Sequence, residues 1–345
     1  MKTKPMTKFA ILALSLVLVA CAGGGSEEAG CPAIDGREIN VVATTPMIGE
    51  FVSQVGGENI NLTVLMPPEA NPHTYEPAPQ DAGTIAEADL VFYTGLLYEP
   101  AALVKLLENS ACSTDILSEV GESVFPIEFK EGGHDDHDDH DDEEGHDDHD
   151  DEEGHDDEEG HDDHEGHNHG AYDPHFWFDP SRVAYAAEYI ESRLIEFDPE
   201  NESSYKSSAD SFVSELNDLT KQVSELISTV PSQNRKLITT HESLGYLEAK
   251  FGLEVLSTII PSLNSANEIS PSDLAGVIDV IEDNNVKVIF IESEAPSVYS
   301  ETIVAETGIK SVTGLYVETL KPGQSYSEFL ISNVTLITEN LQDTD

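Results

Sequence analysis

Residues 131–170 constrain the fold of this chain more than any other stretch, because they contain no apolar side chain. They consist almost entirely of His, Asp, Glu and Gly, in units such as His-Asp-Asp and Asp-Asp-Glu-Glu-Gly-His. A segment with no apolar surface to bury cannot offset the conformational entropy that is lost on folding. We therefore predict that this stretch is a disordered loop inserted into the fold. The core must be built from the sequence on either side of it.

Short apolar runs alternate with amphipathic segments on both sides of the loop. Before the loop, the pattern predicts strands at 39–45, 60–66 and 90–94 and helices at 47–55, 81–88 and 101–108. After the loop, it predicts helices at 181–196 and 201–229, then strands at 236–240, 255–260, 286–291 and 310–317 and helices at 243–251, 270–283, 300–306 and 327–341. Alternation of strand and helix is typical of parallel sheets covered by helices. We predict an α/β protein with two halves, each able to bury its own core.

The N-terminus has the pattern of a secretory signal. Three lysines precede the apolar run 9–20, which is too short to span a bilayer. The run ends in Leu18-Val19-Ala20-Cys21, which resembles the lipobox of bacterial lipoproteins, where the Cys is diacylated and becomes the new N-terminus. Residues 22–30 would then form a flexible tether. The alternative is an ordinary signal peptide in which the Cys occurs by chance.

The charge of the chain excludes several classes of partner. The full sequence has 16 basic and 68 acidic residues, and without residues 1–20 and 131–170 it still has 13 basic and 46 acidic residues. So acidic a surface argues against binding to nucleic acid or to anionic membranes. It attracts cationic ligands, although adaptation to salty water would give the same composition.

The two remaining cysteines are candidates for a disulfide. If Cys21 is lipidated, Cys31 and Cys112 are left in a chain that is predicted to be exported. Exported proteins fold in oxidising compartments, where cysteine pairs form disulfides. The alternative is a pair of free thiols.

Only three histidines lie outside the loop, namely His73, His175 and His241. Each lies just after or near an extended run, and His175 is also flanked by prolines in Asp173-Pro174-His175-Phe176-Trp177-Phe178-Asp179-Pro180. A single histidine of this kind is more often structural than a metal ligand. Three at such junctions, in an exported protein with ten further histidines in one loop, predict a shared metal site built from loop ends.

The segments around these histidines resemble a known family. Pro72-His73-Thr74-Tyr75-Glu76-Pro77, the His175 segment, and Thr240-His241 with Tyr246 and Phe251-Gly252-Leu253 look like the three histidine motifs of the zinc- and manganese-binding substrate-binding proteins of ABC transporters. The resemblance covers nearly the whole mature chain. It implies two α/β lobes joined by a long rigid helix, with one metal ion in the cleft between them. His73 and His175 would come from the first lobe and His241 from the second.

The fourth ligand in that family is a carboxylate near the end of the second lobe, usually Asp in a Tyr-x-Asp-x-Leu context. This chain has Glu318 at that position, in Tyr316-Val317-Glu318-Thr319-Leu320. The resemblance therefore favours Glu318, with Glu292 and Glu294 as rival ligands and water as a further alternative.

Three imidazoles and one carboxylate favour zinc, because manganese prefers more oxygen ligands. The resemblance agrees, since manganese members of the family tend to have Glu at the position of His241, and zinc members tend to have a long acidic histidine loop. Manganese remains the alternative. We expect weaker zinc sites in the loop itself, formed by His134, His137, His140, His146, His149, His155, His161, His164, His167 and His169.

The predicted function is non-enzymatic capture of zinc for an ABC permease. We expect a monomer at the outer face of the cytoplasmic membrane, or in the periplasm. Its lipid anchor would be its only attachment to the membrane. A zinc-dependent adhesin or metal buffer is an alternative. A secreted zinc hydrolase would need an open water position and a general base such as Glu76 or Glu242, and the chain has no His-Glu-x-x-His motif. The predicted parts are a signal peptide (1–20), a lipidated tether (21–38), a first lobe (39–130 and 171–200) containing the loop (131–170), a linking helix (201–231) and a second lobe (232–345).

Overall fold

The computed structural model describes residues 31, 33–34, 36–68, 70–129, 172–260, 262, 269–294 and 298–342. The predicted signal peptide, Cys21 and the histidine-rich loop lie outside these residues. No helix within the described ranges is both long enough and apolar enough to cross a bilayer.

The first sheet consists of four parallel strands in the spatial order β2-β1-β3-β4. These are β1 (Ile39–Ala43), β2 (Ile60–Val64), β3 (Leu90–Tyr93) and β4 (Leu117–Glu119). The sequence pattern missed β4, because Leu117-Ser118-Glu119 contains a single apolar residue. Pairing with β3 orders this short strand, and Phe92 lies opposite Ser118 in the register.

Three helices connect these strands, namely α1 (Pro46–Gly56), α2 (Pro79–Ala86) and α3 (Ala101–Ser110). Helix α2 begins two residues before the prediction, at a proline, and the Asp81 side chain accepts a hydrogen bond of 2.7 Å from Ala78 N. Helix α1 packs closely on β2 at Gly49. A Cβ at this position would lie only 2.6 Å from Val64 Cγ2. Glycine is therefore required at position 49 for this approach.

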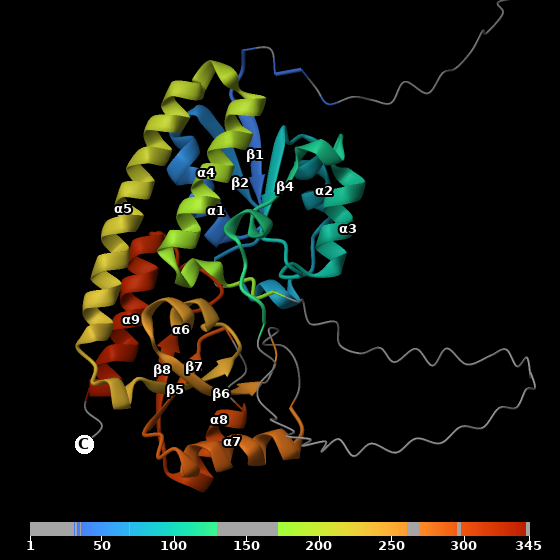
Figure 1. Ribbon diagram of the computed structural model, residues 1–345. Helices are drawn as coiled ribbons and strands as arrows, with labels where there is room; N and C mark the ends of the chain where they lie inside the picture. The colour runs from blue at the N-terminus through green and yellow to red at the C-terminus, as the bar shows by residue number, and fades with distance from the viewer. Residues whose placement is uncertain are drawn as a thin grey trace, which may run out of the picture. The chain divides into compact units, whose positions relative to one another are not determined.

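The described chain resumes at residue 172 and continues into two long helices, α4 (Pro180–Phe197) and α5 (Glu202–Ser228). Both lie close to their predicted bounds. The 27 residues of α5 correspond to about 40 Å of helix. Helix α5 contacts α1 and α4 near the first sheet and α9 (Tyr326–Gln342) near the second, as Figure 1 shows. The apolar stripe of α5 therefore packs against helices from both halves of the chain.

The second sheet repeats the first, with four parallel strands in the order β6-β5-β7-β8. These are β5 (Lys236–His241), β6 (Glu254–Ile260), β7 (Val288–Glu292) and β8 (Lys310–Leu315), and the remaining helices are α6 (Gly245–Phe251), α7 (Pro271–Asp283) and α8 (Val298–Thr307). Helix α6 begins two residues later than predicted. Ser243 lies outside it, and its hydroxyl donates to Glu292 Oε1 at 3.2 Å.

The predicted α/β architecture of two mostly parallel sheets flanked by helices is confirmed. The cores of the two halves are less separate than the sequence indicated. Two smaller clusters each belong to one sheet, but the largest cluster includes Phe51 and Trp177 from the first half and Phe290 and Phe329 from the second. Apolar contacts between the halves are therefore continuous, and the chain from Cys31 onward clusters as one compact unit.

The predicted disulfide between Cys31 and Cys112 is confirmed. The two Cα atoms lie 5.0 Å apart, and the residues are separated by 81 positions in the sequence. The bond fastens the segment before β1 to the segment that follows α3.

Candidate metal centre

One of the three isolated histidines ends a strand, and the other two lie in or next to short 3-10 turns. His241 is the last residue of β5. His73 lies in a 3-10 turn (Pro72–Thr74) that follows β2 in the chain, and the Asn71 side chain accepts a hydrogen bond from His73 N at 2.9 Å. His175 immediately precedes another 3-10 turn (Phe176–Phe178). The two short turns fix the backbone at His73 and His175. They leave these two imidazoles free to point away from the sheet.

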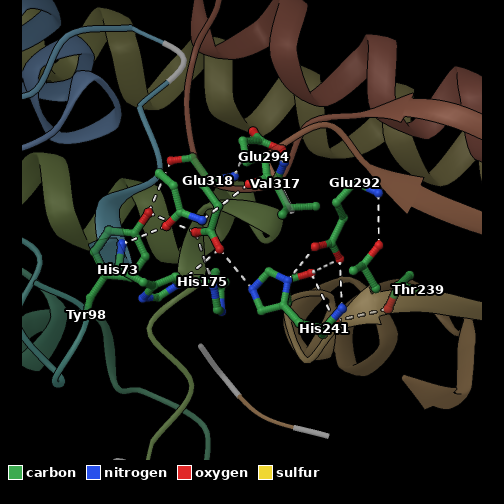
Figure 2. Close-up of polar contacts among 12 residues, drawn as sticks. His73, Tyr98, His175, Thr239, His241, Glu292, Glu294, Val317 and Glu318 are labelled. Atoms are coloured by element: carbon green, nitrogen blue, oxygen red, sulfur yellow. Dashed lines mark hydrogen bonds and ion pairs between the residues drawn. The ribbon is translucent and has the colours of Figure 1, made fainter. Parts of the chain in front are cut away.

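These three imidazoles and the carboxylate of Glu318 come together, although they come from four separate segments (Figure 2). One ligand atom from each residue lies within 4.8 Å of the others. The side chain of His73 is 4% exposed and the other three side chains are fully buried. The cluster is therefore a closed, water-poor site with three nitrogen donors and one oxygen donor.

The ring nitrogens converge on the carboxylate without forming a regular hydrogen-bond network. Glu318 Oε1 lies 3.0 Å from His73 Nε2 and 2.8 Å from His241 Nε2, and Glu318 Oε2 lies 3.5 Å from His175 Nε2. Nε2 of His175 and Nε2 of His241 are buried, and among the described residues neither has a partner at an acceptable hydrogen-bond angle. Of the three ring nitrogens, only His73 Nε2 is hydrogen-bonded to the carboxylate, and the other two are buried and directed at it as the ligands of a cation would be.

Carboxylates behind two of the rings orient them. Asp173 Oδ1 lies 2.8 Å from His175 Nδ1 and also accepts from His175 N at 2.9 Å. Glu292 makes a short contact through Oε2 with His241 Nδ1 and accepts from His241 N through Oε1 at 3.2 Å. A hydrogen bond from Nδ1 to a carboxylate leaves Nε2 as the metal-binding atom and fixes the orientation of the ring.

The electrostatics of the site suit a divalent cation. Burial alone lowers the pKa of His175, but Glu318 and Asp173 raise that pKa to about 9. The pKa of His241 is also raised well above its usual value, because Glu292 and Glu318 outweigh the effect of burial. Burial alone would raise the pKa of Glu318, but the three imidazoles hold it well below its usual range. A divalent cation bound by these side chains would compete with protons for the same ligand atoms.

Glu292 and Glu294, the rivals of Glu318 for the fourth ligand position, lie outside the cluster. Glu292 contacts the far side of the His241 ring. The carboxyl of Glu294 accepts from Val317 N at 3.2 Å and from Glu318 N at 3.3 Å. Burial, together with Glu318 and Glu292, raises the pKa of Glu294 to about 8, so this carboxyl is mostly neutral at pH 7. The geometry brings only Glu318 of the three into the cluster.

The two carboxylates considered as general bases also lie outside the cluster. Glu76 is exposed. Glu242 accepts from Thr258 Oγ1 at 3.1 Å, and burial raises the pKa of its carboxyl to about 7.

Sequence reasoning missed two residues beside the cluster. Tyr98 donates from its hydroxyl to Glu318 Oε2 at 2.9 Å, and nothing in its local sequence indicates this contact. Asp173 was noted only as part of the motif around His175. Its position two residues before the histidine is a usable signal, since Asp side chains commonly bond to the backbone two residues on.

Several predicted site residues lie outside the described part of the chain. These are the lipidation candidate Cys21 and the ten histidines of the loop, from His134 to His169.

Comparisons with known proteins find similar chains over nearly the whole length of this one. A family model for ZnuA, described as "Zinc-uptake complex component A periplasmic", matches residues 41–340. The chain is 27% identical over 343 residues to the high-affinity zinc uptake system protein ZnuA of Bacillus subtilis, covering 96% of each chain. It is 26% identical over 348 residues to the manganese ABC transporter substrate-binding lipoprotein PsaA of Streptococcus anginosus, covering 98% of this chain and 99% of that protein.

The fold is also similar to that of a solved structure, the periplasmic zinc-binding protein TroA of Treponema pallidum. The TM-score is 0.71 at 20% sequence identity, and the match covers 88% of this chain and 99% of TroA. The two-sheet architecture is therefore a known arrangement of two lobes.

Proposed function

The chain belongs to the family of periplasmic zinc-uptake components, and from this premise we propose that it binds one zinc ion outside the cytoplasm and delivers the ion to the permease of an ABC importer. The observation that carries the proposal is the convergence of His73, His175, His241 and Glu318 in one buried cluster. The family is one of uptake proteins, not of enzymes. Four protein ligands suit capture of an ion, because catalytic zinc sites usually have three protein ligands and keep one position open for water.

We favour zinc over manganese because of the donor set. Zinc in proteins is commonly four-coordinate with histidine nitrogen and carboxylate oxygen ligands, whereas manganese prefers sites richer in oxygen. Relatives with both kinds of name match this chain at similar identity, so overall similarity does not separate the two metals. The third imidazole supports zinc, since His241 supplies nitrogen where a carboxylate would supply oxygen.

Competition against a chelator tests this proposal. The purified protein should bind one zinc ion tightly and manganese much more weakly. His241→Ala should weaken zinc binding by orders of magnitude, and His241→Glu should shift the preference towards manganese by adding an oxygen donor. If His73→Ala and His241→Ala both bound zinc as tightly as the parent, the metal would lie elsewhere.

An adhesin or a metal buffer of the same fold would bind zinc equally well, so uptake needs a separate test. A strain without the gene should grow poorly when zinc is scarce and recover when zinc is added. Unchanged growth at low zinc would favour the adhesin or the buffer.

We further propose that the protein is tethered through lipidated Cys21, since relatives are named lipoproteins. We also propose that it acts as a monomer. A tether keeps a captured ion close to the membrane that holds the permease. In this proposal residues 39–130 and 171–200 form the first lobe, 201–231 the linking helix and 232–345 the second lobe.

The histidine-rich loop, residues 131–170, would bind further zinc ions weakly and raise the local zinc concentration. Its ten histidines lie among carboxylates, so many two- or three-ligand sites are available. Each such site must order a flexible segment, a cost that a preformed cluster avoids.

A further inference from the structure

The two oxygens of the Glu318 carboxylate have different surroundings. Oε1 faces His73 Nε2 at 3.0 Å and His241 Nε2 at 2.8 Å. Oε2 accepts a hydrogen bond of 2.9 Å from the hydroxyl of Tyr98, which also lies 3.1 Å from the main-chain oxygen of Glu318. Figure 2 shows Tyr98 on the His73 side of the cluster. Oε1 is therefore directed at two ring nitrogens, whereas Oε2 is engaged by a phenol and lies farther, 3.5 Å, from the third ring nitrogen, His175 Nε2.

Tyr98 is held firmly in this position. The residue is 1% exposed, and its ring packs edge-on against His73, His175 and Trp177, with centroid separations of 5.1, 5.9 and 5.3 Å. Such packing leaves the phenol little freedom to turn away from Glu318.

The loop before Tyr98 adopts a strained backbone that buried carboxylates stabilise. Leu96 and Leu97 both have positive φ angles, of 53° and 61°, which are unfavourable for residues with a side chain. Glu99 accepts from Gly95 N at 2.9 Å, and Glu119 accepts from Leu96 N at 2.9 Å. Strain of this kind persists only where surrounding contacts fix it, and here the result is a precisely placed hydroxyl.

The backbone of Glu318 is fixed as well. Trp177 Nε1 donates to Val317 O at 2.8 Å, and Glu294 accepts from Glu318 N at 3.3 Å. The Glu318 side chain is also fully buried, so its carboxylate has little room to rotate and offer both oxygens to a metal ion.

We propose that Tyr98 restricts Glu318 to binding through one oxygen and thereby makes the site selective for zinc over manganese. This inference rests on the proposed function. A one-oxygen carboxylate and three imidazoles complete a tetrahedral zinc shell. Manganese prefers a larger shell that is rich in oxygen, and a carboxylate that binds through both oxygens supplies one more donor. By occupying Oε2, the phenol withholds that donor.

The test compares Tyr98→Phe with the parent in the full-length protein. Zinc and manganese affinities are measured by chelator competition, and the metal shell is measured by X-ray absorption. Loss of a hydrogen bond to a charged group should lower the ratio of zinc to manganese affinity by about tenfold. X-ray absorption should show that manganese bound to the variant has one more oxygen ligand than manganese bound to the parent.

Tyr326→Phe is the matched control. Tyr326 is also 1% exposed and donates to a main-chain oxygen, that of Trp177, at 2.7 Å. Among the described residues, none of its hydrogen bonds or ring contacts involves the four clustered residues, so its loss should lower thermal stability without changing the affinity ratio.

The outcomes separate this inference from the proposed function. If Tyr98→Phe kept the parent's affinity ratio and metal shell while the parent bound one zinc tightly, the role of Tyr98 would be refuted and zinc capture would stand. A parent whose zinc shell contained both Glu318 oxygens would overturn the inference even if the variant failed to fold. A parent that bound no zinc would overturn the proposed function, and the inference with it.

Discussion

Replacing Glu292 should weaken zinc binding, although its carboxylate is not one of the four groups in the cluster. Glu292 is the last residue of β7, and its side chain is fully buried. Its carboxylate contacts His241 Nδ1 and accepts from His241 N and from Ser243 Oγ, each at 3.2 Å. These contacts orient the ring so that Nε2 faces Glu318 Oε1 at 2.8 Å.

The expected loss follows from what each substitution leaves behind. Glu292→Leu removes the acceptor for Nδ1, so the His241 ring is free to rotate or to change tautomer. Partners of this kind typically contribute about 10- to 100-fold in metal affinity, or roughly 1.4–2.8 kcal/mol. Glu292→Gln keeps an oxygen that can accept from Nδ1, and we expect a loss nearer the lower limit.

The two variants should differ in stability as well. Leucine leaves the buried N–H groups of His241 without the Glu292 acceptor, at about 1–3 kcal/mol for each unsatisfied group, whereas the Ser243 hydroxyl still has His241 O as an acceptor at 3.4 Å. Glutamine satisfies part of this need, so its unfolding temperature should lie between those of Glu292→Leu and the parent.

Zinc affinity would be measured by competition with a chromophoric chelator at one fixed pH, alongside thermal unfolding of the metal-free protein. Glu254→Gln is the matched control, since Glu254 lies exposed on β6, with Lys236 Nζ 3.9 Å away. An affinity for Glu292→Leu within about twofold of the parent, against the 10- to 100-fold loss expected here, would refute the claim that Glu292 orients His241.

Further outcomes are expected elsewhere in the chain. Glu318→Ala should weaken zinc binding less than loss of a histidine, because water can occupy the vacated position, and an X-ray absorption spectrum identical to the parent's would remove Glu318 from the metal shell. Replacing Cys31 and Cys112 together by serine should lower the free energy of unfolding in a denaturant titration by about 4 kcal/mol, the chain-entropy value for so long a loop. Deleting residues 133–169 should leave one tight zinc per chain and remove the weak sites. In the parent, those weak sites should release zinc near pH 5, where most histidines are protonated. If calorimetry gave the same zinc stoichiometry before and after the deletion, the loop would be a spacer only. Cys21→Ser should move the protein out of the membrane fraction, and recovery there at the parent's level would contradict lipid anchoring.

The sequence by itself determined the class of fold and the three histidines. Alternating apolar runs reflect contacts that every strand and helix of an α/β protein must make, so their period can be read locally. Helices α4 and α5 were predicted almost to the residue, because Asp179-Pro180 marks the start of α4 and Asp198-Pro199 separates it from α5. The histidines stood out because the rest of the chain outside the loop has none.

Only the tertiary structure decided which carboxylate joins them. Glu292 ends β7, Glu294 follows it and Glu318 follows β8, and local sequence cannot tell which carboxylate points into the cluster. The answer depends on contacts across the chain, such as that of Tyr98 with Glu318, which are 220 positions apart. The short strand β4 was missed for the same reason, since its pairing partner orders it rather than its own three residues. Patterns within one element are set by its own period, whereas a site assembled from four segments is set by how the packed elements meet.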